Sequence, residues 1–146
     1  MNGLTPFVTH WSAAYIGVPH RPRGRSLEGA DCWGLVRLAL WQEAGVRTPS
    51  FVDDYTDKLE RAEIAAIVSD ETSKTALWIE VDKKEARPFD VAIFGAPAGG
   101  LHIGLVALPN RILHVAAGSV SELAWLDRGP WGRRCALIYR HRDLMR

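Results

Sequence analysis

The chain has 146 residues, with 18 Lys and Arg against 17 Asp and Glu, and its formal net charge is +1. This length suits a single domain over residues 1–146 with one hydrophobic core. So small a net charge creates no long-range field towards nucleic acid or an anionic membrane, and we expect neither as a partner. No apolar run approaches the roughly 20 residues of a membrane span, so we expect no membrane insertion. Residues 1–10 also lack the basic and then apolar pattern of a secretory signal peptide.

The N-terminal part is predicted to hold a short amphipathic helix. Thr5-Pro6 is typical of a helix start, because a hydroxyl side chain caps the first turn and proline fits its first position. Trp11 and Tyr15 then follow at helical spacing, and Gly17 ends the segment. Residues 18–30 are rich in Pro, Gly and Arg, which predicts a loop.

Two further helices are expected before the middle of the chain. The first starts at Asp31 or Cys32 and runs to about Ala44, where the next residue is a glycine that suits a helix end. The second spans about 54–68 by its apolar spacing. It lies in the stretch 46–75, which we interpret as a variable insertion in the domain.

The second half of the chain has the pattern of β-strands, with apolar and β-branched runs bounded by Gly, Pro and Asn. Strands are predicted at 77–81, 89–94, 102–108, 112–116 and 136–141, with a further one near 122–125. Helices followed by an antiparallel meander predict an α+β fold in which N-terminal helices pack on one side of an antiparallel sheet.

Cys32 is the first candidate for chemistry, since it stands at a predicted helix start. The partial positive charge and free N–H groups of a helix N-terminus stabilise a thiolate, the reactive form of cysteine. A buried structural thiol is the alternative for a lone cysteine. The other cysteine, Cys135, lies in a predicted strand. Two cysteines in such different contexts are no disulfide framework, so we expect two thiols.

His102 opens an apolar strand and is the candidate general base for a thiol nucleophile. His114 lies twelve residues later and is the candidate that orients the His102 ring. A regular two-residue turn after Leu108 pairs Leu105 with His114, which places the two histidines on opposite faces of the sheet. A bulge or a longer loop is therefore required to bring them together.

Metal and nucleotide chemistry have weak support. The sequence has no C-x-x-C pair, no H-x-x-x-H pair and no G-x-x-x-x-G-K-[ST] loop. We therefore expect no metal site and no cofactor.

Four segments together resemble the NlpC-type cell-wall peptidases, a papain-like family of cysteine endopeptidases. Asp31-Cys32-Trp33-Gly34-Leu35-Val36 resembles the nucleophile motif, and the segments 15–20, 89–94 and 102–106 are similar to three others in family order. Residues 112–115 resemble the strand of the third catalytic residue. The resemblance covers about residues 7–141 and leaves the insertion unmatched.

The resemblance implies a role for each matching residue. Cys32 would attack a peptide carbonyl, His102 would take the thiol proton, and His114 would orient His102. His20, Asp31 and Trp33 would bind substrate or support the site. His20 stands where the family often has tyrosine, and Trp33 follows the nucleophile where free-standing enzymes often have a small polar residue. In this respect the motif is more similar to members from phage tails and gene-transfer particles.

The resulting hypothesis is a hydrolase of peptidoglycan stem peptides, acting beside a D-glutamyl–diamino-acid linkage as the family does. Its expected location is the tail tip of a phage or phage-like particle, where tail-tip or hub proteins would be partners and the host cell wall or periplasm the site of action. One alternative is a catalytically silent structural or assembly protein of the tail tip that keeps the fold. Another is an acyltransferase or amidase with the same fold, because fold alone does not define the reaction.

Overall fold

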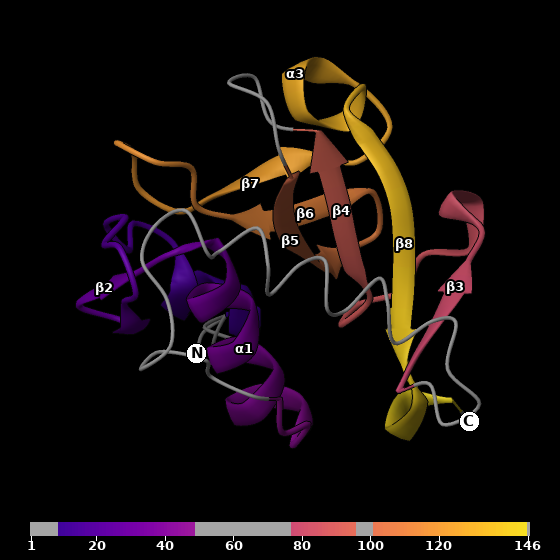
Figure 1. Ribbon diagram of the computed structural model, residues 1–146, viewed down its shortest axis with the longest axis horizontal. Coiled ribbons are helices and arrows are strands. Elements are labelled where there is room, and N and C mark those ends of the chain that lie inside the picture. Colours follow the sequence, from indigo (N-terminus) through magenta and orange to yellow (C-terminus); the bar gives the residue numbers. More distant parts are fainter. Residues whose placement is uncertain (1–8, 49–76, 96–100, 146) are drawn as a thin grey trace, which may run out of the picture.

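The computed structural model describes residues 9–48, 77–95 and 101–145. Within them the chain forms one α-helix of several turns, a small hairpin and a large antiparallel sheet (Figure 1). The elements are, in order, η1 Trp11–Tyr15, β1 Arg25–Ser26, β2 Gly29–Ala30, α1 Cys32–Ala44, β3 Trp78–Val81, η3 Lys83–Glu85, β4 Val91–Gly95, β5 Leu101–Leu108, β6 Arg111–His114, β7 Glu122–Trp125, α3 Gly129–Gly132, β8 Cys135–His141 and η4 Arg142–Leu144.

The helix α1 lies where the sequence predicts it. Asp31 is its N-cap, and the side chain accepts a hydrogen bond from the Gly34 backbone N–H. Gly45 ends the helix in the left-handed conformation, with φ of 69°, which glycine adopts without strain. Val36 and Leu40 are fully buried, so one face of the helix packs into the core.

The six-stranded sheet has the order β3-β8-β4-β5-β6-β7, and all its neighbouring strands are antiparallel. The predicted α+β class is confirmed, but the simple meander is wrong for part of the sheet. Only β4 to β7 follow each other as neighbours. The last strand, β8, enters between β3 and β4, as Figure 1 shows. Helix α1 packs against β5 and β6 of this sheet.

The N-terminal helix differs from the prediction. Its described part is a single 3₁₀ helix, η1, whose N-cap His10 accepts a hydrogen bond from the Ser12 N–H. Trp11 stacks on Phe89 at 4.9 Å between ring centroids, which ties η1 to the sheet. The predicted loop 18–30 contains the hairpin β1–β2. The expected helix start at Thr5-Pro6 and the predicted helix 54–68 lie outside the described residues.

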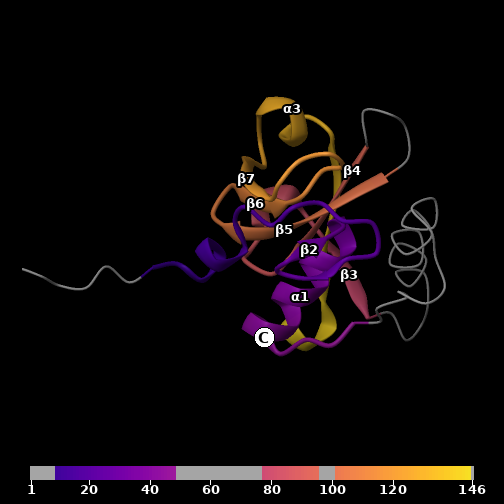
Figure 2. The same ribbon diagram turned by 90° about the vertical axis from the view of Figure 1, so that its left-hand side faces the viewer.

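Each face of the sheet carries its own apolar cluster. Ile103, Leu105 and Leu113 belong to the larger cluster, which includes the buried side chains of α1. Phe94 and Ile112 belong to a smaller cluster on the other face. Because side chains alternate along a strand, the residues that directly precede and follow Ile103, Leu105 and Leu113 point to this second face. In Figure 1 α1 lies to one side of the strands, and in Figure 2, turned so that this side faces the viewer, it lies in front of them. None of the helices in residues 9–48, 77–95 and 101–145 is long and apolar enough to cross a membrane.

Candidate active site

The start of α1 is held by a buried ion pair. Arg25 donates from Nη1 to the Asp31 carboxylate at 2.7 Å, and the same Asp31 oxygen caps the Gly34 N–H at 2.7 Å. A Cβ on Gly34 would lie 2.0 Å from the Gly24 carbonyl oxygen, so only glycine lets the hairpin approach the helix this closely. Asp31, a predicted supporting residue, therefore positions the first turn. Arg25 lies in the segment predicted to be a loop, and its side chain is only 13% exposed and is part of this support.

Cys32 is the first residue of α1 and is 3% exposed. Its thiol therefore lies at the positive end of the helix dipole, beside N–H groups that have no partner within the helix. Neither Cys32 nor Cys135 forms a disulfide, as predicted. The position favours a thiolate, and the backbone N–H groups of the first turn are suitable donors for an oxyanion.

A β-bulge brings His102 and His114 together. Leu108 pairs with Arg111 as the two-residue turn requires, but Val106 pairs with Ile112, so Ala107 is an extra residue in β5. The pairing of Leu105 with His114 expected for a regular hairpin is therefore wrong, and the bulge required for the two histidines to meet is confirmed. His114 now shares a face with His102, and the two rings meet at 2.9 Å between His102 Nε2 and His114 Nδ1.

Glu122 continues this contact on the next strand. It is the cross-strand partner of His114, and its carboxylate lies 3.2 Å from His114 Nε2. This residue is not among those predicted from the sequence. The signal that could have found it is Gly118, which has a positive φ of 76° and lies midway between His114 and Glu122. A hairpin centred on that glycine gives the observed pairing.

Trp131 covers the two imidazoles. Its ring lies 4.4 Å from the His102 ring and 4.9 Å from the His114 ring, measured between centroids. Phe94 contacts both Trp131 and His102, so the pair of histidines sits in an aromatic enclosure. Trp131 lies in α3 and contacts both histidines as well as Phe94. An enclosure of this kind keeps water from competing for the hydrogen bond between them.

Burial controls the protonation of the histidines. It lowers the pKa of His102 to about 3, with smaller contributions in the same direction from His114 and His20. Burial also lowers the pKa of His114, while Glu122 opposes that change. Both shifts favour neutral imidazole near neutral pH, and only neutral imidazole has a lone pair with which to accept a proton.

His20 connects the two halves of the site. Its backbone forms a parallel bridge with Ala30, two residues before Cys32, and its N–H donates to the Ser119 carbonyl. Ser121, directly before Glu122, is bound to the same segment through the Val18 N–H. The segment therefore ties the start of α1 to the start of β7. His20 also contributes to the lowered pKa of His102, which places its charge close to that ring.

Trp33, the last predicted supporting residue, is 1% exposed and belongs to the core under α1. It supports the helix by packing, since an indole buried to this degree offers no surface to a substrate.

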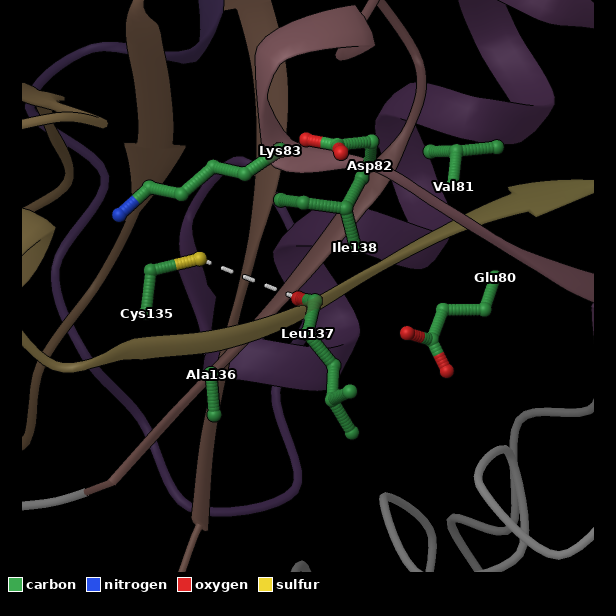
Figure 3. A pocket seen from close by; sticks show the side chains of 8 residues that line it. All are labelled: Glu80, Val81, Asp82, Lys83, Cys135, Ala136, Leu137 and Ile138. Carbon is green, nitrogen blue, oxygen red and sulfur yellow. Dashed lines mark hydrogen bonds between the residues drawn. The ribbon is translucent and has the colours of Figure 1, made fainter.

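Cys135 lies in a different environment. A shallow hollow of about 230 Å³ is lined by this residue and by β3, β8 and the start of η3, as Figure 3 shows. The thiol donates at 3.9 Å to the Leu137 carbonyl of its own strand. Burial raises the pKa of Cys135, which disfavours the thiolate. Among the described residues no histidine lines this hollow, so Cys135 has no imidazole base there.

Within the described residues, no group of three or more His, Cys, Asp and Glu side chains is placed to hold a metal ion. The candidate reactive groups are the helix-start thiol and the chain of His102, His114 and Glu122.

A thiol at a helix start beside a histidine-bearing antiparallel sheet defines a papain-like α+β domain. No family model matches the sequence. The probable endopeptidase NlpC of Escherichia coli (strain K12) is 24% identical over 132 residues, which cover 88% of this chain and 70% of that protein. The solved NlpC/p60 domain of the peptidoglycan hydrolase SagA has a TM-score of 0.57 at 18% identity, over 88% of this chain and 92% of that one. An NLP/P60 protein from Staphylococcus aureus has a TM-score of 0.59 at 20% identity, over 89% of this chain and 38% of that one. The chain therefore has the fold of the NlpC/P60 domains, and its sequence is similar to that of a probable endopeptidase.

Proposed function

We propose that the protein is a cysteine peptidase that cleaves peptidoglycan stem peptides. The observation that carries this proposal is the hydrogen-bonded chain from Glu122 through His114 to His102, whose two histidines lie on β5 and β6, the strands against which the Cys32 helix packs. The relationship to a probable endopeptidase and to a peptidoglycan hydrolase domain supports the substrate class.

The proposed reaction is covalent and has two stages. His102 takes the Cys32 thiol proton, and the sulfur attacks the carbonyl carbon of an amide bond. The backbone N–H of Cys32 stabilises the oxyanion. The C–N bond then breaks as His102 returns the proton to the leaving amine. Water, deprotonated by His102, hydrolyses the thioester and releases a carboxylic acid and the free thiol. The bond proposed is the one beside the D-glutamyl–diamino-acid linkage.

The deciding experiment measures release of muropeptides from purified peptidoglycan of known chemistry. Cys32→Ala should abolish release, a loss on the order of 10⁴-fold or more. Cys135→Ser is the matched control and should retain most of the turnover, because its thiol lies in a separate hollow lined by no described histidine. Equal loss in both variants would contradict the assignment. No release by the wild-type protein on any wall type would instead favour a silent structural role.

We propose further that the protein acts from the tail tip of a phage or phage-like particle, in the host cell wall or periplasm. The support is the Trp33 that follows Cys32 in the nucleophile motif, and an exposed aromatic side chain, Trp125, on the edge strand β7. Mass spectrometry of purified particles should find the protein in constant proportion to the tail proteins. Its absence from particles and presence elsewhere in the cell would remove the particle role and leave the peptidase proposal intact.

A further inference from the structure

The bond between His114 and Glu122 joins a buried group to an exposed one. The His114 side chain is 3% exposed, whereas that of Glu122 is 58% exposed, and 3.2 Å separates Nε2 from the carboxylate oxygen. The reaction steps proposed above are carried by Cys32 and His102, and none of them is assigned to Glu122. Its position on the edge strand, opposite His114, gives it access to that imidazole from outside the aromatic enclosure.

The carboxylate fixes which nitrogen of each ring carries a proton. An ionised carboxylate only accepts hydrogen bonds, so His114 must donate to it from Nε2. Neutral His114 then has its lone pair on Nδ1, and that atom faces His102 Nε2 at 2.9 Å. His102 must therefore donate from Nε2, which leaves the lone pair of neutral His102 on Nδ1.

We propose that Glu122 is a positioning residue of the site, which holds both histidines in the tautomers that leave His102 Nδ1 free to accept a proton. This inference rests on the proposed function in one respect, namely that His102 is the base for the Cys32 thiol. Without the carboxylate, either ring nitrogen of His114 can carry the proton. The population with a protonated His102 Nδ1, which cannot act as a base, then rises.

The charge of Glu122 also matters once His102 has taken the thiol proton. His102 is then a cation with both nitrogens protonated, and it still donates from Nε2 to His114. Two groups face this pair. His20, from the segment beside Ala30, destabilises the imidazolium when it is charged, whereas the Glu122 carboxylate on β7 stabilises it. Glu122 is thus the anionic end of a chain that stabilises the transient imidazolium.

Nitrogen-15 NMR of the histidine rings tests the inference without any substrate, because protonated and unprotonated ring nitrogens are resolved in neutral imidazole. In the wild-type protein, His102 and His114 should both be protonated at Nε2. Glu122→Gln retains an acceptor oxygen and should keep these tautomers. Glu122→Lys offers His114 only a donor, so protonation should move to Nδ1 in both rings. Unchanged tautomers in Glu122→Lys would overturn the inference, whatever an activity assay shows.

Turnover provides a second and separate readout. Glu122→Lys should lower kcat roughly 10- to 100-fold with little change in KM. The size of this effect is taken from metal-bound histidines, where loss of the partner that orients the ring lowers activity by the same factor. Glu122→Gln should recover most of the rate. Asp143→Ala is the matched control, since Asp143 is an exposed carboxylate 3.8 Å from buried His141, away from the site. A tautomer change without loss of turnover would also overturn the inference. An inactive wild-type protein with the expected tautomers would count against the proposed function alone.

Discussion

His102 and His114 have different partners, and this difference assigns them different work. In the tautomers set by Glu122, only His102 has a lone pair that is not directed at another ring. His102→Ala should therefore remove most of the rate, on the order of 10²- to 10⁴-fold, because it removes the base itself. His114→Ala should cost less, because it removes only the orienting partner. Measurement of kcat and KM for both variants decides, and a larger loss for His114→Ala would contradict the assignment.

Burial of His102 also has a consequence for stability. The ordinary pKa of 6.5 applies in the unfolded chain, whereas in the folded protein the pKa is lowered to about 3. Between these values the unfolded state binds more protons, so the free energy of unfolding falls as the pH drops below about 6.5. From pH 7 to pH 5 we expect His102 to account for a loss of about 2 kcal/mol.

Urea unfolding at both pH values checks this, with His102→Gln as the variant. The variant should lose less stability between pH 7 and pH 5 than the wild-type protein does. Equal losses would show that His102 titrates alike in the folded and unfolded states. His114 and His141 retain their own lowered pKa values, so part of the pH dependence should persist in the variant.

The elements of the site differ in how far the sequence predicts them. The limits of α1 follow from its end residues, a capping Asp31 and a terminating Gly45, which act locally. The meeting of His102 and His114 depends on Ala107, and an alanine in a strand gives no local sign of a bulge. The required irregularity could be inferred only by assuming that the two histidines meet. Gly118 indicates a turn between His114 and Glu122, but the sequence does not fix the length of that turn, so the pairing of these two residues does not follow from the glycine alone.

Gly104 is the residue that lets β5 and β6 close on each other beside the bulge. A Cβ there would lie 2.5 Å from Ile112 Cγ2 and 3.3 Å from His114 Cβ. Gly104→Ala should therefore push the strands apart at His114, weaken its bond to His102, and destabilise the fold by about 1–3 kcal/mol. Gly95→Ala is the control, since a Cβ at Gly95 would have no atom of the described residues within 4 Å. Thermal unfolding and muropeptide release should separate the two variants, and equal behaviour would contradict the packing argument.

At the scale of the whole molecule, the sequence predicts the composition of the fold better than its order. Apolar periodicity separates α1 from the strands, and every predicted strand in the described residues has a counterpart. The insertion of β8 between β3 and β4 is a pairing of strands far apart in sequence, such as Trp78 with His141. Periodicity carries no information on such partners. The division of residues 1–146 into one domain with an insertion at 46–75 stays a prediction, since most of that stretch lies outside the described residues.

The surface of the molecule gives the particle proposal its own test. Trp125 is 39% exposed on the edge strand β7, between Arg111 and Arg128, whose guanidinium carbons lie 3.8 and 4.1 Å from the ring centroid. An aromatic ring held in place by two arginines is suited to protein contact, because it loses little freedom on binding.

If the tail tip binds this surface, Trp125→Ala should reduce the amount of protein in purified particles about 10-fold or more, as expected when a residue worth over about 1.4 kcal/mol is lost. Muropeptide release by the isolated variant should be unchanged. Trp41→Ala is the matched control, because Trp41 on α1 is 45% exposed and, like Trp125, has an arginine, Arg47, over its ring. Equal incorporation of both variants would exclude Trp125 from docking, and equal loss would indicate a general effect of removing an exposed indole.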